Sequence, residues 1–413
     1  MTMRNSKIRL YSVPGKILLV LAIGGFMFSC EKESTDPPHI TNIRMVDPEM
    51  ADVPIEGAGL ENWVVIQGTG FSTTQEIYFN EYQAIFNPVL VSENNIVIQI
   101  PAGTPNIGTD SLAPNTVRVV TQYGEDTYSN FIVFAPPAEI STMTNEFALP
   151  GDTIVLSGRY FYAVDSVIFP GGYPGEVLST SDDGEECTVV VPDGASNPGP
   201  IRVVTPGGTG ESGYFRDTVS VMINDFDGLN FLDWGRLPVT PSEATLPVIS
   251  GNYFGAAAED VGTGNWWVDP TAMPLAIGSL PDEIEGGSLA TNLYLKFEVN
   301  ITGIWNSGFY KLEFAETDAE GTWLQQYTYL LQEWGTSATD RTDFNTKGKW
   351  ITYKIPLSEW TNNNLPMETW SDMENYNRIQ WVFVNPWAPP ESIDIEYIYF
   401  AFDNIRILYE ESE

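Results

Sequence analysis

Tryptophan is the residue type in this chain whose number and placement could support binding chemistry. Eleven of the twelve tryptophans lie between residues 220 and 413. An indole ring is large, flat and stiff, so an exposed one offers a platform on which the apolar face of a ligand can stack by dispersion. We expect five of them, which lie in loop-like or glutamine-rich segments, to be exposed binding residues: Trp266, Trp267, Trp305, Trp323 and Trp334.

For each of these five rings the alternative is ordinary packing in a core. Trp266 and Trp267 are adjacent in the chain and would point to opposite sides if the backbone is extended, so only one of them is expected to bind. Trp387, which lies in a proline-rich segment, could serve either role. Five others are predicted to be packing residues: Trp234, Trp350, Trp360, Trp370 and Trp381.

Charge and histidine content exclude several other kinds of chemistry. The 413 residues include 19 Lys and Arg against 55 Asp and Glu, for a net charge of −36. Nucleic acid and anionic membrane surfaces both require a basic footprint, so neither is expected as the main partner. The single histidine, His39, follows two prolines near the start of the chain. Ser-His-Asp triads, Cys-His pairs and His-rich metal sites are therefore excluded.

The elements that must position the tryptophans have the pattern of short β-strands. Glycine (36 residues) and proline (29 residues) interrupt the chain frequently. Alternating apolar residues predict strands at 293–300, 350–355, 379–384 and 392–408. No stretch of 12 residues has a helical period. We therefore predict one all-β domain over residues 220–413, a jelly roll of two packed sheets.

An internal repeat precedes this domain. Three segments recur in the same order: Trp63–Phe71 with Thr153–Phe161, Gln99–Gly103 with Val190–Gly194, and Val117–Thr121 with Ile201–Thr205. Such repetition is typical of duplicated modules, and the short β-branched strands between turns predict a small β-sandwich for each. We place the modules at 39–136 and 137–219. Two prolines, Pro136 and Pro137, make the linker between them short and stiff.

The N-terminus has the pattern of a targeting signal. Four basic residues precede an apolar run at 17–29 that is too short to span a membrane and that ends at Cys30. This order resembles a bacterial lipoprotein signal, in which residues 1–29 are removed and Cys30 is lipidated; a plain signal peptide is the alternative. Residues 30–38 would then form a polar tether. Residues 31–36 resemble the acidic export signal of surface lipoproteins in Bacteroidota.

The two halves of the chain also resemble known families. The glycine turns at Gly68–Phe71 and Gly158–Phe161 resemble those of IPT/TIG immunoglobulin-like domains. The segments Asp225–Gly228, Gly348–Ser358 and Phe402–Ile407 are similar to jelly-roll carbohydrate-binding modules. With the lipoprotein signal, this architecture resembles the surface glycan-binding proteins of Bacteroidota. The implied fold is all-β, with two immunoglobulin-like sandwiches in tandem followed by a larger jelly-roll sandwich.

The resemblance implies a non-catalytic lipoprotein in the outer membrane that faces the cell exterior and captures a neutral polysaccharide, a β-glucan such as xyloglucan. A pyranose presents C–H bonds on one face, which an indole ring matches, and hydroxyls at its edge. The five candidate tryptophans would form the platform. The implied partners are a TonB-dependent transporter and its glycan-binding lipoprotein, and the chain would contact the membrane only through the lipid on Cys30.

Two other functions stay open. The C-terminal domain could serve a surface adhesin or a structural protein. It could also be a glycoside hydrolase, which requires two carboxylates roughly 5–10 Å apart. Glu298 and Glu313, which alternate with apolar residues in predicted strands, are candidates for that pair.

No cofactor is expected, apart from a candidate structural calcium ion. Asp225 and Asp403 carry the oxygen ligands that Ca²⁺ prefers, near the two ends of the C-terminal domain. In jelly-roll sugar-binding modules the first and last strands often share such an ion. The alternative for both residues is a solvated carboxylate or a turn cap.

Overall fold

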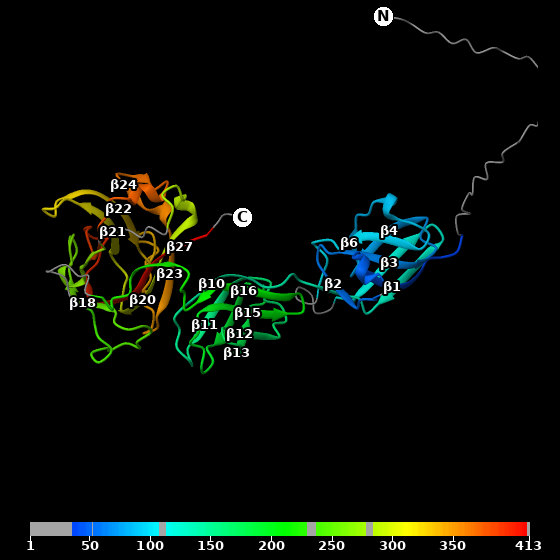
Figure 1. Ribbon diagram of the computed structural model, residues 1–413, viewed down its shortest axis with the longest axis horizontal. Coiled ribbons are helices and arrows are strands. Elements are labelled where there is room, and N and C mark those ends of the chain that lie inside the picture. Colours follow the sequence, from blue (N-terminus) through cyan, green and yellow to red (C-terminus); the bar gives the residue numbers. More distant parts are fainter. Residues whose placement is uncertain (1–34, 52, 107–112, 229–236, 278–283, 411–413) are drawn as a thin grey trace, which may run out of the picture.

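The structure is a computed structural model that describes residues 35–51, 53–106, 113–228, 237–277 and 284–410. These residues form three β-sandwiches in succession (Figure 1), so the predicted all-β class is confirmed. Among them, no helix is long and apolar enough to cross a membrane. Cys30 and Trp234 lie outside the described residues. The helical elements are short 3-10 turns: Pro48–Met50, Pro88–Leu90, Asp269–Thr271, Ala290–Asn292, Leu357–Glu359 and Trp370–Met373.

The first module is a sandwich of two sheets and one parallel strand pair. One sheet has the order β1 (His39–Met45), β3 (Trp63–Thr69), β6 (Asn95–Gln99). The other has the order β5 (Tyr82–Ala84), β4 (Thr74–Phe79), β7 (Thr116–Thr121), β8 (Gly124–Ser129). The parallel pair is β2 (Gly57–Gly59) with β9 (Ile132–Phe134). Alternate residues such as Ile66, Ile77 and Val119 are buried between the sheets.

The second module repeats this plan, as the internal repeat predicts. Its strands are hydrogen-bonded in the order β10 (Glu139–Met143), β11 (Thr153–Arg159), β14 (Glu186–Val190), β13 (Tyr173–Thr180), β12 (Ser166–Phe169), β15 (Gly199–Thr205), β16 (Gly208–Phe215). The aligned segments that begin at Trp63 and Thr153 become the equivalent strands β3 and β11. Each pairs with the first strand of its own module, in the same antiparallel sense.

The chain enters each module through a pair of prolines, Pro37-Pro38 or Pro136-Pro137. In each pair one proline packs against a glycine of a hairpin in that module. A Cβ atom on Gly124 would lie 3.3 Å from Pro37, and one on Gly208 would lie 3.0 Å from Pro137. Both glycines have positive φ, 147° and 131°, which other residues rarely adopt. Proline also fixes its own φ. The direction in which the chain enters each module is therefore determined both by the proline backbone and by its contact with the glycine.

The C-terminal domain is a sandwich of two larger sheets, as predicted. The first sheet has the order β17 (Val221–Asn224), β27 (Ile395–Tyr409), β20 (Leu293–Gly303), β23 (Ile351–Pro356), and β18 (Phe254–Val261) also pairs with β27. The second has the order β19 (Met273–Ala276), β26 (Arg378–Val384), β21 (Phe309–Thr317), β22 (Trp323–Leu331), β24 (Thr361–Asn362), β25 (Leu365–Pro366). All four predicted strands of this domain are present.

Aromatic rings fill the space between these two sheets. The ring of Phe297 lies 5.0 Å from that of Trp381, and Tyr310 lies 4.6 Å from Phe400. The tryptophans predicted to pack are buried, which confirms that prediction within the described chain: Trp350, Trp360, Trp370 and Trp381. Much of the aromatic content of this domain therefore stabilises its fold.

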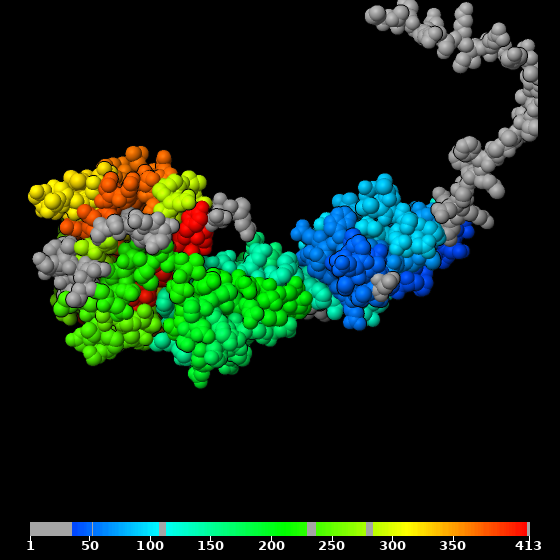
Figure 2. Space-filling model, viewed as in Figure 1, coloured from blue at the N-terminus to red at the C-terminus, as the bar shows by residue number. Residues whose placement is uncertain are grey.

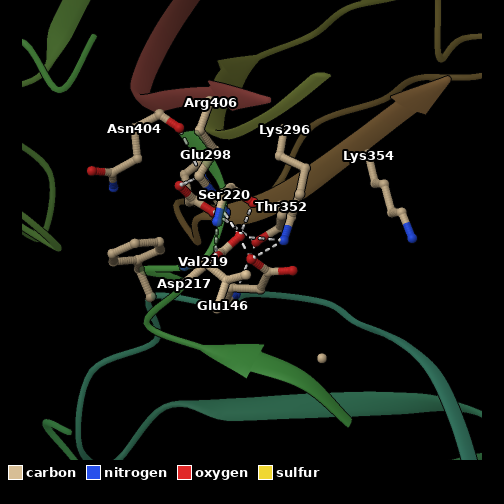
Figure 3. A network of polar contacts seen from close by, with 12 residues as sticks. Glu146, Asp217, Val219, Ser220, Lys296, Glu298, Thr352, Lys354, Asn404 and Arg406 are labelled. Atoms are coloured by element: carbon tan, nitrogen blue, oxygen red, sulfur yellow. Dashed lines mark hydrogen bonds and ion pairs between the residues drawn. The ribbon is translucent and has the colours of Figure 1, made fainter. Parts of the chain in front are cut away.

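A buried ionic network joins the second module to the first sheet of the C-terminal domain (Figure 3). Arg406, from β27, donates to Glu298 of β20 (Nη1 to Oε2, 2.8 Å) and to Glu146 of the second module (Nη2 to Oε2, 2.7 Å). Lys296 lies 2.6 Å from the same Glu146 and 2.8 Å from Asp217. We call these five residues the joint network. Figure 2 shows the two domains in broad contact, whereas the first module meets the second at a narrow neck.

Candidate functional site

The two sheets of the C-terminal domain differ in what covers their outer faces. On the first sheet the outward side chains of Lys296, Glu298 and Arg406 are buried beneath the second module. On the second sheet the residues that alternate with the core point away from the second module. Leu324 and Leu330, on β22, are about half exposed there (55% and 48%). We therefore take the outer face of β19, β26, β21 and β22, with the loops at its ends, as the candidate site, and call it the outer sheet face.

One end of the outer sheet face carries a group of aromatic rings. Trp266 is 66% exposed and Trp387 is 39% exposed. Their loops adjoin, because Asn265 and Asn385 exchange backbone hydrogen bonds of 2.9 and 2.7 Å. The ring of Trp387 lies 5.2 Å from that of Phe309, with the planes tilted by 55°. This aromatic end can present flat, stiff rings to a ligand.

Trp267 differs from its neighbour Trp266, as expected for adjacent residues in a nearly extended segment. It is half-buried and packs against a small apolar cluster on the outer sheet face that includes Phe309, Val382 and Val384. Its indole Nε1 donates to Asp269 Oδ1 at 3.3 Å. Trp267 therefore packs on the sheet beside the aromatic end, whereas the Trp266 side chain is exposed to solvent.

Polar groups lie along the middle of the outer sheet face. Lys311 Nζ lies 3.1 Å from Glu313 Oε1, and Gln380 pairs across the strands with Glu313. Burial raises the pKa of the Glu313 carboxyl, although Lys311 opposes this effect. Glu313 Oε2 has no hydrogen-bond partner among the described residues. Glu313 and Gln380 are buried (1% and 8%), so the partly exposed Lys311 ammonium is the group of this row that a polar ligand can reach.

The opposite end of the outer sheet face is formed by Trp323 and Arg378. Trp323 is the first residue of β22 and is half-buried. Arg378 is the first residue of β26, and its guanidinium carbon lies 5.9 Å from the centroid of the Trp323 ring. Strand pairing places Ala315 between Arg378 on one side and Gln326 on the other. This end therefore places the Trp323 ring, the N–H donors of Arg378 and the amide of Gln326 near one another.

The prediction of exposure is wrong for Trp305 and Trp334, which are both buried. Trp305 packs edge-on against Phe400 (5.4 Å) and belongs to the core between the sheets. Trp334 donates from Nε1 to the carbonyl oxygen of Gly308 (2.6 Å) and lies under Arg341. Both rings belong to the core cluster between the sheets, so neighbouring glycines and amides do not mark an exposed segment.

Sequence reasoning missed three residues of the outer sheet face. The sequence pattern does not distinguish Phe309 and Arg378 from ordinary strand residues, and it allows either role for Trp387. Phe309 and Arg378 each begin a strand and Trp387 lies in the loop after β26, so their partners come from other strands or loops: Phe309 meets Trp387, and Arg378 meets Trp323. The prolines around Trp387 indicated a loop, and this was the only signal in the sequence.

Glu298 and Glu313 cannot act together as a hydrolase pair. Glu298 lies on the outer face of the first sheet, in the joint network, and Glu313 lies on the outer face of the second. Packed sheets are separated by about 10 Å, and these two side chains point away from each other across that distance. They therefore cannot flank one glycosidic bond.

The candidate calcium ligands Asp225 and Asp403 lie near enough to each other for the Asp225 carboxylate to raise the pKa of Asp403, and each also accepts a local backbone hydrogen bond. Asp403 Oδ1 accepts a hydrogen bond from the Asn404 amide (2.8 Å), and Asp225 Oδ1 accepts one from the Asp227 amide (3.1 Å). Within the described ranges, no group of three or more acidic, histidine or cysteine side chains is placed to hold a metal ion. Burial, reinforced by Glu298, raises the pKa of Asp403 well above its usual value, which favours a neutral carboxyl.

Comparisons with known protein families match two parts of the chain. Residues 215–409 match the family described as the surface glycan-binding protein B xyloglucan binding domain, and residues 54–133 match the IPT/TIG domain family. An IPT/TIG domain-containing protein from Bacteroides ovatus is 26% identical over 182 residues, a match that spans 44% of this chain and 36% of the relative.

Solved structures of two surface glycan-binding proteins share the fold along most of the chain. PbSGBP-B from Prevotella bryantii superimposes with a TM-score of 0.61 at 18% identity, over 91% of this chain and 99% of that one. SGBP-B from a complex xyloglucan utilization locus in Bacteroides uniformis gives 0.50 at 18% identity, over 90% and 99%.

Proposed function

We propose, on the premise that residues 215–409 form a domain of the surface glycan-binding protein B xyloglucan-binding family, that this chain is a non-catalytic glycan-binding protein. Its ligand is a neutral polysaccharide, a β-glucan such as xyloglucan. The family description and the xyloglucan utilization locus of the Bacteroides uniformis protein support this ligand class.

The observation that carries the proposal is the aromatic end of the outer sheet face. Trp266 and Trp387 stand exposed on adjoining loops beside a sheet that the second module does not cover. An indole ring stacks on the C–H face of a pyranose, and the partly exposed Lys311 ammonium can donate to its hydroxyls. The net charge of −36 favours a neutral glycan, because a polyanion would be repelled.

The affinity for a single site should be modest. A few stacking rings with partly solvated hydrogen bonds give a Kd on the order of µM to mM. A polysaccharide repeats the same unit along its length, so binding to the polymer on a surface that holds many copies of the protein gains avidity. Reversible capture of this strength suits a protein that must pass its ligand on.

We further propose that Cys30 is lipidated after removal of residues 1–29 and that the chain is held at the outer membrane, facing outward. The pattern of basic residues, apolar run and cysteine supports this. The partners would be a TonB-dependent transporter and its glycan-binding lipoprotein. Replacement of Cys30 by alanine should move the chain from the detergent phase to the aqueous phase in a Triton X-114 partition. Unchanged partitioning would refute lipidation.

Affinity gel electrophoresis of all three domains tests the binding proposal. We expect xyloglucan or another neutral β-glucan in the gel to retard the protein, with no reducing ends released from the polysaccharide in solution. Mannan and laminarin complete the panel. No retardation in any gel would overturn the proposal and favour the adhesin, whereas release of reducing ends would favour a hydrolase.

A further inference from the structure

Asn385 is a fully buried amide at the end of β26 that has hydrogen-bond partners on both its oxygen and its nitrogen. Its Nδ2 donates to the carbonyl oxygens of Ile393 (2.8 Å) and Gly262 (3.3 Å). Its Oδ1 accepts from the hydroxyl of Ser307 (2.8 Å). A buried amide without partners would be costly, so these contacts hold the side chain and the segments around it in one arrangement.

The groups that Asn385 contacts belong to the two loops that carry the exposed rings of the aromatic end. Gly262 directly follows β18 and leads into the loop of Trp266. Ile393 lies near the end of the loop that carries Trp387, shortly before β27 begins. One buried side chain therefore ties both loops to the end of β26.

Ser307 holds the Trp387 loop from a third segment, the turn between β20 and β21. Its side chain is fully buried, and its hydroxyl both donates to Asn385 and accepts from the amide of Ile393 (2.9 Å). Two residues further along the chain lies Phe309, against which the ring of Trp387 packs. The same turn therefore fixes the end of this loop and supports its ring.

The two loops also contact each other directly beside the rings. The Gly264 amide donates to the carbonyl oxygen of Trp387 (3.2 Å), and Asn265 and Asn385 exchange two backbone hydrogen bonds. Trp266 directly follows Asn265, so the backbone at both rings is set by hydrogen bonds between the loops. Rings placed in this way need little further ordering when a ligand binds.

We propose that Asn385 and Ser307 are positioning residues of the aromatic end, which hold Trp266 and Trp387 in their binding arrangement before a ligand arrives. Neither side chain can touch a ligand, because both are fully buried. This inference rests on the proposed function and deepens it by making the site a preformed one. Loss of either side chain should weaken binding through the rings, although every group that contacts the ligand is still present.

Calorimetric titration of all three domains with xyloglucan, and with mixed-linkage glucan as a second probe, measures the effect on affinity. Ser307→Ala should weaken binding about five- to tenfold, because a ring on an untied loop must be ordered when the ligand binds. Asn385→Ala removes contacts to both loops and should weaken binding further. If Asn385→Ala does not fold, Ser307→Ala alone decides the question.

Thr346→Val is the matched control. The Thr346 hydroxyl is also buried, donates to Asn300 Oδ1 (3.2 Å) and accepts from the amide of Ile301 (3.0 Å), so it has the same kinds of partner as Ser307. Its partners lie on β20 rather than on the loops that carry the rings. Thr346→Val should therefore leave the affinity for both glycans unchanged.

Fluorine NMR of protein labelled with fluorotryptophan separates ring position from folding. In the wild-type chain Trp266 and Trp387, assigned by Trp→Phe variants, should each give one resonance that shifts when xyloglucan is added. In Ser307→Ala these two resonances should move or broaden without ligand. The resonance of Trp381, which is buried between the sheets, should stay in place if the fold is intact.

Three results would overturn the inference, and they can be told apart. If both variants bind the glycans as tightly as the wild-type chain does, the two buried residues do not position the rings, although the proposed function stands. If affinity falls while the resonances of Trp266 and Trp387 stay unchanged, the loss does not pass through the rings. If the wild-type chain binds neither glycan, the proposed function itself fails, and the inference with it.

Discussion

Trp381 and Trp387 lie six positions apart and show how exposure divides the tryptophans by role. Trp381 is fully buried between the sheets, whereas Trp387 is 39% exposed at the aromatic end. A buried indole stabilises the domain through its contacts, and an exposed one contributes little to stability but can contact a ligand. Substitutions at the two positions should therefore have separable effects on folding and on binding.

Replacing Trp387 by alanine should weaken polysaccharide binding at least tenfold and leave the thermal midpoint within a few degrees of wild type. Trp381→Ala should instead lower the free energy of unfolding by about 3–5 kcal/mol, because it opens a large cavity among aromatic rings. Affinity gels and denaturant unfolding measure the two effects. A Trp387→Ala protein that binds normally would remove this residue from the site.

Asp403 should make stability depend on pH in a defined direction. Burial and Glu298 raise the pKa of Asp403 in the folded protein, so the folded state holds this proton more tightly than the unfolded state. Its stabilising contribution is complete below the unfolded pKa, near 3.9, and is lost as the pH rises through the folded pKa.

Asp403→Asn keeps the oxygen that accepts the Asn404 amide but cannot ionise. Relative to wild type, this variant should gain stability as the pH rises from 4 to 8, on the order of 1 kcal/mol. Urea unfolding across that range gives the difference curve. If the difference in unfolding free energy between the two proteins does not change with pH, the pKa of Asp403 is not raised in the folded state.

At the scale of elements, the loop that leaves β10 acts as part of the C-terminal domain. The Glu146 amide donates to Thr352 Oγ1 on β23 (2.8 Å), while its carboxylate meets Arg406 and Lys296. Phe147 joins Tyr253 and Trp350 in an apolar cluster beside the joint network. Lys296 outweighs burial and lowers the pKa of Asp217, so this carboxylate stays ionised. Each of the three carboxylates of the network therefore contacts at least one of its two cations.

Replacing Arg406 by methionine should destabilise the protein strongly. It leaves Glu298 buried without its cation and Glu146 with only Lys296, and breaking a buried pair in this way costs about 3–5 kcal/mol. Arg118→Met is the matched control, since Arg118 pairs with the exposed Glu81 in the first module. That change should cost about 1 kcal/mol or less. Equal losses in urea unfolding would show that the joint network contributes nothing beyond a surface pair.

The strands could be predicted from the sequence, whereas the arrangement of side chains from different strands could not. Alternation marks Leu295, Phe297 and Val299 as core residues of β20, because period two is a local property. The same alternation marks Lys296 and Glu298 only as outward residues, and nothing local shows that a second domain covers them. Likewise, Trp305 and Trp323 have similar local surroundings, yet one is buried and the other lies on the outer sheet face.

At the scale of the whole molecule, the second module and the C-terminal domain should unfold as one unit. A fragment of residues 137–413 retains Glu146 and Asp217, whereas residues 220–413 lack both and expose Arg406 and Lys296. The longer fragment should show a single thermal transition, and the shorter one should melt at lower temperature or aggregate. Differential scanning calorimetry of both fragments decides this. Equal midpoints would show that the two domains are independent.

The packing of each proline pair on its own module allows whole modules to be gained or lost during evolution. Pro37 rests on Gly124 and Pro137 on Gly208, so each immunoglobulin-like module carries its own entry segment together with the surface that receives it. The interchangeable unit therefore runs from one proline pair to the next. A further copy of residues 36–134 could be inserted, or the existing one deleted, without disturbing either neighbour. The joint network allows no such exchange, because a module inserted between the second module and the C-terminal domain would separate Glu146 and Asp217 from Lys296 and Arg406.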